Sequence, residues 1–377
     1  MSRSLLAAAT FLTLTAGLSA QAQQPVHKAV TPKHAGVYKM ATGELQPANA
    51  NERVGATVVI FNASELTNYY SVPGLDQEWL DEGSLLDRNA GNWEQMNGME
   101  FVYCSTEADA TQNSGTVTFA FYDDTIVCTG PSNGGNFALG GYLCAYDIVG
   151  LPLGDANGAI QCWIVTVDLQ CGFECPPNLS FDWTTDNANT KLFGWSFIPR
   201  NDNTGPWLSK GGTQASGIDN SFVWFDQFGA LVGCFWFGGT PFANFAMKMT
   251  GNEDNARAYN PSAPGAGDDL CLNIDMSGWP PIISFVLKNV NATEDYYLVV
   301  SLGTAELSLP TGTLLVDHTN MPVPPVAMPG GAVSVNAGGG MGLTVYFQAV
   351  CVPAGSGPPS PSNLPQRWSN GWCVSLL

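Results

Sequence analysis

The sequence predicts an all-β protein with two antiparallel β-sandwich domains, a larger N-terminal jelly-roll or sandwich and a smaller C-terminal sandwich of immunoglobulin-like size. Three observations predict this class. Short runs of alternating apolar and polar residues recur from Gly55 onward, clusters of glycine, asparagine, aspartate and proline separate these runs, and ten cysteines are available to join the strands. Only the segment from Gln77 to Asp87 favours a short helix.

Length, hydrophobic content and net charge limit the number of domains and the classes of partner that we expect. At roughly 150 residues per domain, the 377 residues correspond to about two domains, and a hydrophobic content of 45% is too high for a disordered chain. With 13 basic residues against 32 acidic ones, the formal net charge is -19. This charge excludes nucleic acid and anionic lipid as expected partners, because both are themselves strongly negative.

The N-terminus has the pattern of a Sec signal peptide. Arg3 precedes an apolar stretch from Leu5 to Leu18, and the small residues Ala20 and Ala22 form an A-x-A cleavage pattern. The apolar stretch is shorter than the ~20 residues that a membrane-spanning helix needs. We therefore expect residues 1–22 to be removed, the mature chain to be secreted or held at the cell surface, and residues 23–53 to form a loosely attached polar leader.

The N-terminal domain is expected to span residues 54–250. The segment from Thr116 to Tyr122 shows the strand pattern most clearly, because valine and phenylalanine alternate there with threonine, alanine and tyrosine. Tyr122 and Thr118 fall on the face opposite the phenylalanines. Further strands are predicted at Cys162–Leu169, Phe193–Phe197, Phe222–Phe225 and Phe245–Thr250.

A polar segment rich in glycine, proline and aspartate, residues 251–269, is predicted to be a linker. The C-terminal domain then covers residues 270–377, a length that suits a small sandwich with Pro-rich turns. Its predicted strands are Ile282–Asn289, Tyr296–Leu302, Gly312–Asp317, Ala332–Asn336, Leu343–Val352 and Trp372–Leu377.

The cysteines indicate an oxidising compartment. Ten cysteines in an exported chain are read as up to five disulfides. The spacing favours a disulfide between Cys171 and Cys175, which would close a small loop. It also favours a disulfide between Cys351 and Cys373, which would close the Pro/Ser/Gly-rich segment between them. A zinc site is disfavoured, because the chain has three histidines and no paired C-x2-C spacing.

Four carboxylates surround one tryptophan near the start of the N-terminal domain: Asp76, Glu78, Asp81 and Glu82. Oxygen ligands of this kind suit calcium, which is the one cofactor that the sequence leaves open. A pair of carboxylates could also serve glycoside hydrolysis. The third interpretation is a solvated acidic surface, which a chain of this charge has in many places.

Tryptophans in loop-like contexts are the candidates for carbohydrate binding, because a flat ring stacks on a sugar face. These candidates are Trp79, Trp93, Trp183 and Trp207. A serine triad is disfavoured, since two of the three histidines, His27 and His34, lie in the leader and His318 ends a predicted strand.

Several segments together resemble the secreted two-domain β proteins of planctomycete-type marine bacteria, a group without an assigned activity. They are E-W-L-D-E-G at Glu78–Gly83, Y-C-S-T at Tyr103–Thr106, C-W-I-V-T-V-D-L at Cys162–Leu169, F-G-W-S-F at Phe193–Phe197 and L-T-V-Y-F-Q at Leu343–Gln348. The resemblance implies export and a pair of β-sandwiches, and it transfers no catalytic residue.

The sequence therefore predicts an exported, non-enzymatic structural or interaction protein, with a glycan or a surface protein as partner. The alternatives are a carbohydrate-binding module that may use calcium and, third, a glycoside hydrolase acting through the carboxylates around Trp79.

Overall fold

The computed structural model describes residues 26–47, 58–85, 94–127, 138–177, 192–209, 221–235, 244–252, 256–259, 269–277, 282–336 and 342–376. Within these residues every element is a β-strand, apart from one 3-10 turn at Pro329–Gly331. The prediction of an all-β fold is confirmed. The described residues contain no helix that is long and apolar enough to cross a membrane, and the predicted signal peptide lies outside them.

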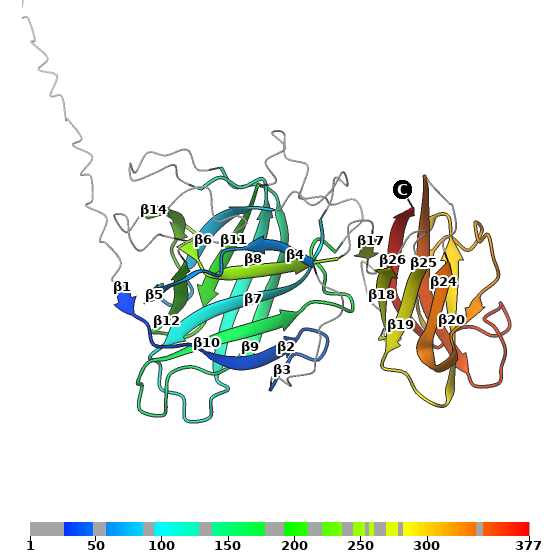
Figure 1. Cartoon of the computed structure of the whole chain (residues 1–377), viewed down its shortest axis with the longest axis horizontal. Coiled ribbons are helices and arrows are strands. Elements are labelled where there is room, and N and C mark those ends of the chain that lie inside the picture. The colour runs from blue at the N-terminus through cyan, green and yellow to red at the C-terminus, as the bar shows by residue number, and fades with distance from the viewer. Residues whose placement is uncertain are drawn as a thin grey trace, which may run out of the picture.

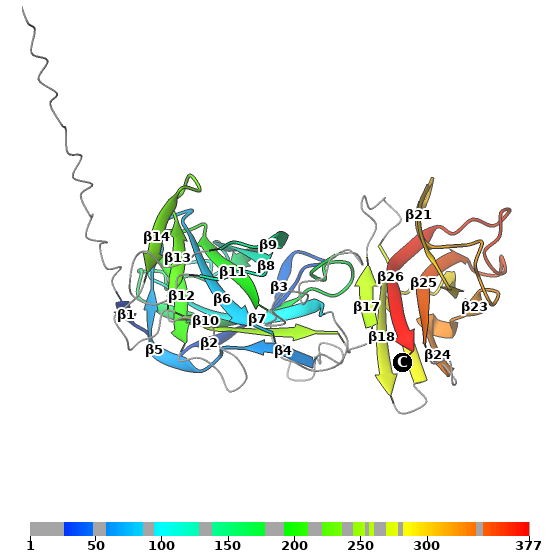
Figure 2. The ribbon, with the colours of Figure 1, turned by 90° about the horizontal axis from the view of Figure 1, so that it is seen from above.

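Two sheets pack face to face around the first hydrophobic core (Figures 1 and 2). One is a ten-stranded sheet with the order β1-β5-β12-β7-β10-β2-β3, to which β4, β15 and β16 are joined. The other has the order β14-β13-β6-β11-β8-β9. The strands are β1 (Val26–Lys28), β2 (Lys33–Lys39), β3 (Glu44–Gln46), β4 (Val58–Asn62), β5 (Leu66–Ser71), β6 (Glu78–Ser84), β7 (Met96–Ser105), β8 (Gly115–Asp123), β9 (Tyr142–Leu151), β10 (Gln161–Asp168), β11 (Leu192–Pro199), β12 (Thr204–Ser209), β13 (Phe222–Phe225), β14 (Leu231–Phe235), β15 (Asn244–Phe245) and β16 (Met247–Gly251).

The remaining strands form a second group around a separate core (Figure 1). A five-stranded sheet has the order β17-β26-β25-β20-β23, a three-stranded sheet has the order β18-β19-β24, and β21 pairs with β22. These strands are β17 (Ala256–Tyr259), β18 (Cys271–Ser277), β19 (Ile282–Lys288), β20 (Glu294–Ser301), β21 (Thr304–Leu309), β22 (Gly312–Val316), β23 (Val326–Ala327), β24 (Ala332–Asn336), β25 (Leu343–Pro353) and β26 (Arg367–Leu376). The finer assignment to jelly-roll and immunoglobulin-like domains stays a prediction.

Three segments differ from the sequence prediction. The described part of the polar leader is not loose: β2 pairs in parallel with β10, and Tyr38 is buried in the first core. Gln77–Asp87 contains the strand β6 in place of a helix, because its alternate side chains are buried on both faces of a sheet. Within the predicted linker, Ala256–Tyr259 forms β17 and pairs with β26, since Ala256 and Ala258 pack into the second core.

Covalent and polar contacts join the two groups of strands. The disulfide between Cys171 and Cys271 connects the segment after β10 to the start of β18. The buried Gln95 side chain donates from Nε2 to the Ala258 carbonyl (2.6 Å), and the Ala258 N–H donates to Gln95 Oε1 (2.8 Å). Gln95 thus pairs with a backbone edge of β17 as another strand would, and it ties the two groups at a point separate from the disulfide.

Candidate functional site

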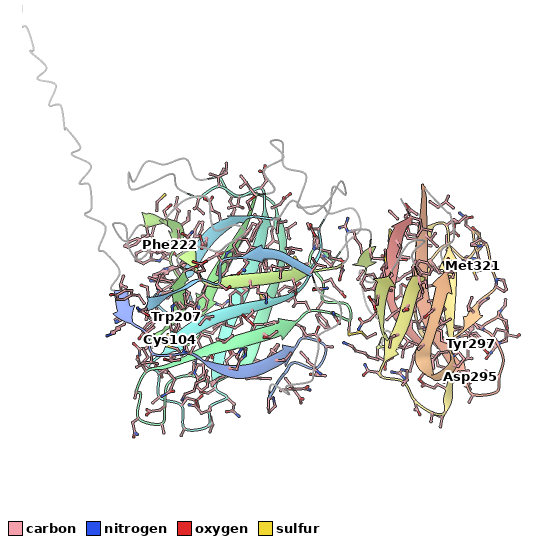
Figure 3. All side chains as sticks on the ribbon, viewed as in Figure 1. Cys104, Trp207, Phe222, Asp295, Tyr297 and Met321 are labelled. Carbon is pink, nitrogen blue, oxygen red and sulfur yellow. A yellow bond between two sulfur atoms is a disulfide. The ribbon has the colours of Figure 1, made fainter. Side chains whose placement is uncertain are left out.

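Of the four tryptophans predicted as sugar platforms, the two that the structure describes, Trp79 and Trp207, are buried. Trp79 is fully buried in the first core, stacked on Phe222 at 4.4 Å. Trp207 is buried against the outer side of the ten-stranded sheet and donates its indole N–H to the Thr67 carbonyl (Figure 3). Both were expected in loops. Both lie in strands instead, and each side chain points to a buried face of its sheet. Trp93 and Trp183 lie outside the described residues.

The four carboxylates around Trp79 make four separate contacts. Asp76 forms an ion pair with Arg200 at 2.8 Å. Glu78 accepts a hydrogen bond from the Tyr122 hydroxyl (2.9 Å). Asp81 and Glu82 are buried and, as neighbours on a strand, point to opposite faces of the sheet. Among the described residues no group of three or more His, Cys, Asp or Glu side chains could hold a metal ion, and these four carboxylates are not gathered at one point.

Asp81 links the two sheets of the first sandwich. Its carboxyl group accepts hydrogen bonds from the backbone N–H of Phe245, on the opposite sheet (2.8 Å), and of Glu82 (2.9 Å). Burial raises the pKa of Asp81 well above its ordinary value, an effect that these hydrogen bonds partly offset. On the other face of β6, Glu82 Oε2 accepts from the Val127 N–H (2.6 Å). These two acids fix the position of β6.

The cysteine pairing differs from the prediction. Cys171 is bonded to Cys271, and Cys175 to Cys144, so the two do not pair with each other. Cys351 and Cys373 are free and buried. In the β25–β26 ladder Cys351 is opposite Arg367 and Cys373 is opposite Tyr346; a separation of six positions, about 20 Å, is far beyond disulfide reach.

A third disulfide was not predicted from the sequence spacing. Cys104 on β7 and Cys162 on β10 are direct cross-strand partners, and they form a disulfide with a Cα–Cα distance of 4.0 Å (Figure 3). Because such partners are distant in sequence, only the strand register brings them together.

On the outward face of the six-stranded sheet Tyr142 and Asp147 are exposed, Glu78 and Tyr122 are half-buried, and Thr118 is buried beneath them. We call this surface the open face and define it by Glu78, Thr118, Tyr122, Tyr142 and Asp147. They lie on β6, β8 and β9, in positions that alternate with buried core residues. Tyr142 is 58% exposed. The open face therefore pairs a rigid, core-packed underside with an accessible aromatic surface.

Tyrosines occupy one part of the open face. Tyr122 and Tyr142 are cross-strand partners, and their rings make an edge contact with centroids 6.1 Å apart. From β8 the Tyr122 hydroxyl reaches across β11 to donate to Glu78 on β6. Burial, together with the adjacent Glu78 carboxylate, raises the pKa of Tyr122, so the phenol stays protonated as a donor.

Charged side chains occupy another part. Asp147 accepts a hydrogen bond from the Thr118 hydroxyl. Arg200 donates from Nε to Thr118 Oγ1 (2.9 Å) and from NH1 to Asp76 (2.8 Å). The Arg200 guanidinium is therefore already bonded to Asp76 and Thr118, and among the residues that the structure describes it makes no hydrogen bond or ion pair with Glu78 or Asp147.

An apolar hairpin tip stands at one edge of the same sheet. Asp226 Oδ1 accepts from the backbone N–H groups of Phe228 and Ala230, both at 2.9 Å, and Gly229 has a φ of 76°. This bonded turn holds Phe228 with 85% of its surface exposed. Phe225, just before the turn, is the direct partner of Glu78.

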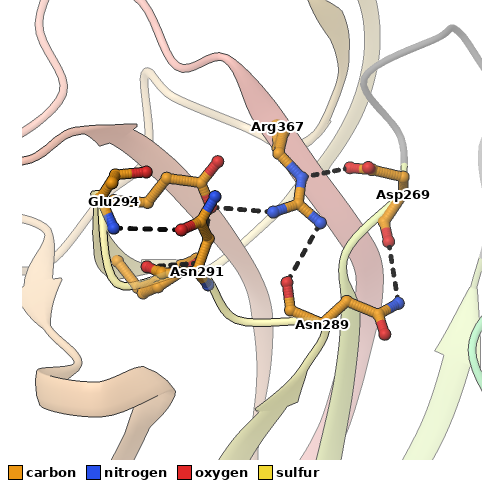
Figure 4. A network of polar contacts seen from close by, with 7 residues as sticks. Asp269, Asn289, Asn291, Glu294 and Arg367 are labelled. Carbon is orange, nitrogen blue, oxygen red and sulfur yellow. Dashed lines mark hydrogen bonds and ion pairs between the residues drawn. The ribbon is translucent and has the colours of Figure 1, made fainter.

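A dense polar cluster in the second group of strands is structural (Figure 4). Arg367 on β26 donates to Asp269 (2.7 Å), Glu294 (2.8 Å) and the Asn289 carbonyl (3.2 Å). Glu294 also accepts from the Tyr296 hydroxyl (2.6 Å). The guanidinium donates from all three of its nitrogens to these partners, and the cluster serves to hold the β19–β20 turn against β26.

Sequence reasoning missed the open face, although part of its signal was visible. The alternation in β8 places Thr118 and Tyr122 away from the core, but nothing in the sequence aligns them with Tyr142 or Glu78. That alignment depends on the order β6-β11-β8-β9. No protein-family model matches the chain, and no curated protein matches it.

Proposed function

We propose that this chain is an exported, non-enzymatic interaction protein that binds its partner across the open face. The observation that carries the proposal is the exposure of Tyr142, beside the Tyr122–Glu78 pair, on a sheet whose other face is a closely packed aromatic core. A surface aromatic group on a rigid sheet loses little conformational entropy when a ligand orders it.

The disulfides and the acidic surface favour export. Three disulfides join described residues, and disulfides of this kind persist in oxidising compartments. Fractionation of the producing cells tests this part of the proposal. We expect the chain outside the cytoplasm with its N-terminus at Gln23, and an intact chain beginning at Met1 in the cytoplasm would contradict it.

The binding role is tested with purified mature protein and envelope material from the producing cells. Tyr142→Ala removes the exposed ring of the open face. Tyr69→Ala, a matched control, removes a ring that is 40% exposed on the ten-stranded sheet. We expect Tyr142→Ala to lose retention on the envelope and Tyr69→Ala to keep it. Equal retention of both variants would exclude the open face as the binding surface.

A further inference from the structure

We infer that the β13–β14 hairpin is a self-association surface, through which two copies of this chain pair edge to edge. The inference goes beyond the proposed function and does not depend on it. Three properties of the hairpin support it. It has an exposed apolar tip on a buried base, it has an edge that no described strand pairs, and that edge lacks the charges that the comparable strands carry.

The hairpin has a fixed base and a projecting tip (Figure 2). At the base, Phe222 and Phe235 are buried in the first core, with ring centroids 5.4 Å apart. On its other side β13 pairs with β6 only as far as Phe225, which is opposite Glu78, the first residue of β6. The turn after Phe225 therefore extends past β6, and its own hydrogen bonds to Asp226 hold it in shape.

The tip exposes three apolar side chains within five residues. Phe228 is 85% exposed, Leu231 57% and Val232 43%. Together they expose roughly 300 Å² of apolar surface, which is in the range of the patches that mark interaction sites on monomers. Stable dimers bury about 800 Å² on each partner. The hairpin therefore suits a reversible association, with a dissociation constant in the micromolar range.

The outer edge of β14 favours a β-strand as the partner. β14 ends the order of its sheet, so a row of its backbone N–H and C=O groups has no strand partner among the described residues. Another strand supplies the matching donors and acceptors. A lipid surface lacks them and would bury these groups unpaired. Gly233, in the middle of β14, has no side chain to block the approach of a second backbone.

The absence of charge on β14 favours a second copy as that strand. Four strands end the two sheet orders of the first group, and three of them carry an exposed charged side chain: Lys28 on β1, Glu44 on β3 and Asp147 on β9. Such charges protect an edge from pairing. β14 has none, and its copy, antiparallel about a two-fold axis, is equally uncharged. Because each chain has a net charge of -19, two copies repel least where both lack charge.

Sedimentation velocity of the purified chain, over concentrations of about 1 to 100 μM, tests the inference. We expect a monomer–dimer equilibrium that added salt shifts toward the dimer, because salt screens the repulsion between copies. Leu231→Lys puts a charge on the edge. Val286→Lys is the matched control, since Val286 is 50% exposed on β19, a strand that is paired on both sides. We expect Leu231→Lys to raise the dissociation constant about tenfold or more, and Val286→Lys to leave it unchanged.

Hydrogen exchange locates the contact. We expect the amides of Leu231–Phe235 to gain protection as the concentration rises, and those of Tyr142–Leu151, at the opposite edge of the same sheet, to show no change. Both lysine variants change exposed residues, so melting temperatures equal to that of the wild type show that a lost dimer is not a lost fold.

Four results would overturn the inference: a monomer at every concentration and salt level, a dimer that Leu231→Lys leaves intact, equal weakening by Leu231→Lys and Val286→Lys, or protection of β9 in place of β14. Neutral phosphatidylcholine vesicles test the lipid alternative. If they capture the wild-type chain but not Phe228→Ser, and no dimer forms in solution, the hairpin is a membrane contact and the inference is wrong.

Discussion

Glu174 buries its carboxyl group between two cysteines, Cys171 and Cys175, that are bonded to different parts of the chain. Its Oε2 accepts from the Gly172 N–H (3.0 Å), and among the described residues Oε1 has no hydrogen-bond partner. Burial raises the pKa of Glu174 from its ordinary value of 4.5 to about 7. Folding therefore binds a proton in the interval between these two values.

This shift predicts a pH dependence of stability with a definite sign. Since the folded pKa lies above the unfolded one, the stabilisation is complete below the unfolded pKa and is lost as pH rises through about 7. Glu174→Gln keeps an acceptor for Gly172 and removes the charge. In urea titrations we expect it to raise the free energy of unfolding at about pH 8, on the order of 3 kcal/mol, and to change little at about pH 4. An equal effect at both pH values would contradict this.

The two free thiols make a second residue-scale prediction. Burial raises the pKa of Cys351 and of Cys373 to about 11 each, so neither is a thiolate at neutral pH. We expect iodoacetamide, without reductant, to leave both unlabelled in the native protein and to alkylate both in denaturant. Peptide mass spectrometry reads this directly, and unlabelled Cys351 and Cys373 in denaturant would support the bridge that their spacing suggested.

Single residues were the hardest to assign from the sequence. Trp79 has acids on both sides in the sequence and looks exposed, yet β6 is the third strand of a six-stranded sheet and the face that carries Trp79 packs into the first core. The position of a strand within a sheet decides exposure, and alternation alone does not reveal it. For the same reason the sequence did not predict the exposure of Tyr142, which follows from the edge position of β9.

Among the elements, strands with strong alternation were predicted closely and strands with weak alternation were missed. Phe222–Phe225 coincides with β13, and Ala332–Asn336 coincides with β24. The N-terminal strands were missed because Lys33–Lys39 is polar at both ends, and only Ala35 and Tyr38 of this strand pack against the first core. Parallel pairing with a distant strand leaves no local signature.

The packing of β2 predicts that the N-terminal segment contributes to stability. Tyr38 is 2% exposed and lies in the first core. We expect Tyr38→Ala to lower the free energy of unfolding by about 3 kcal/mol, as loss of a large buried ring does elsewhere. Tyr69→Ala serves as the control, because that ring is 40% exposed. Equal denaturation midpoints for the two variants would show that the segment is a loose leader after all.

On the scale of the whole molecule, a disulfide and several polar side chains link the two core clusters. The Cys171–Cys271 disulfide, Gln95 and the contact of Lys288 with Gln170 (3.3 Å) connect them. The all-β class was predictable from the alternation pattern, and the division into two domains stays a prediction. The pairing of Cys171 was not predictable, because it depends on how the two groups meet.

Removal of this disulfide tests how much the link contributes to the free energy of unfolding. The bridge closes a separation of 100 residues, and loop-closure entropy for that length predicts a loss of about 5 kcal/mol in the double variant Cys171→Ala, Cys271→Ala. Thermal unfolding of the variant and the wild type, both kept oxidised, measures the loss. An unchanged melting curve would mean that the two groups fold and hold together without the bridge.

The central claim is that the open face is the surface by which this protein works, and hydroxyl-radical footprinting on envelope material of the producing cells tests it most directly. The account predicts that Tyr142 becomes protected from oxidation on binding, while Tyr69 and Phe173, exposed elsewhere on the chain, keep their reactivity. Protection of Tyr69 or Phe173 with Tyr142 unchanged would contradict it.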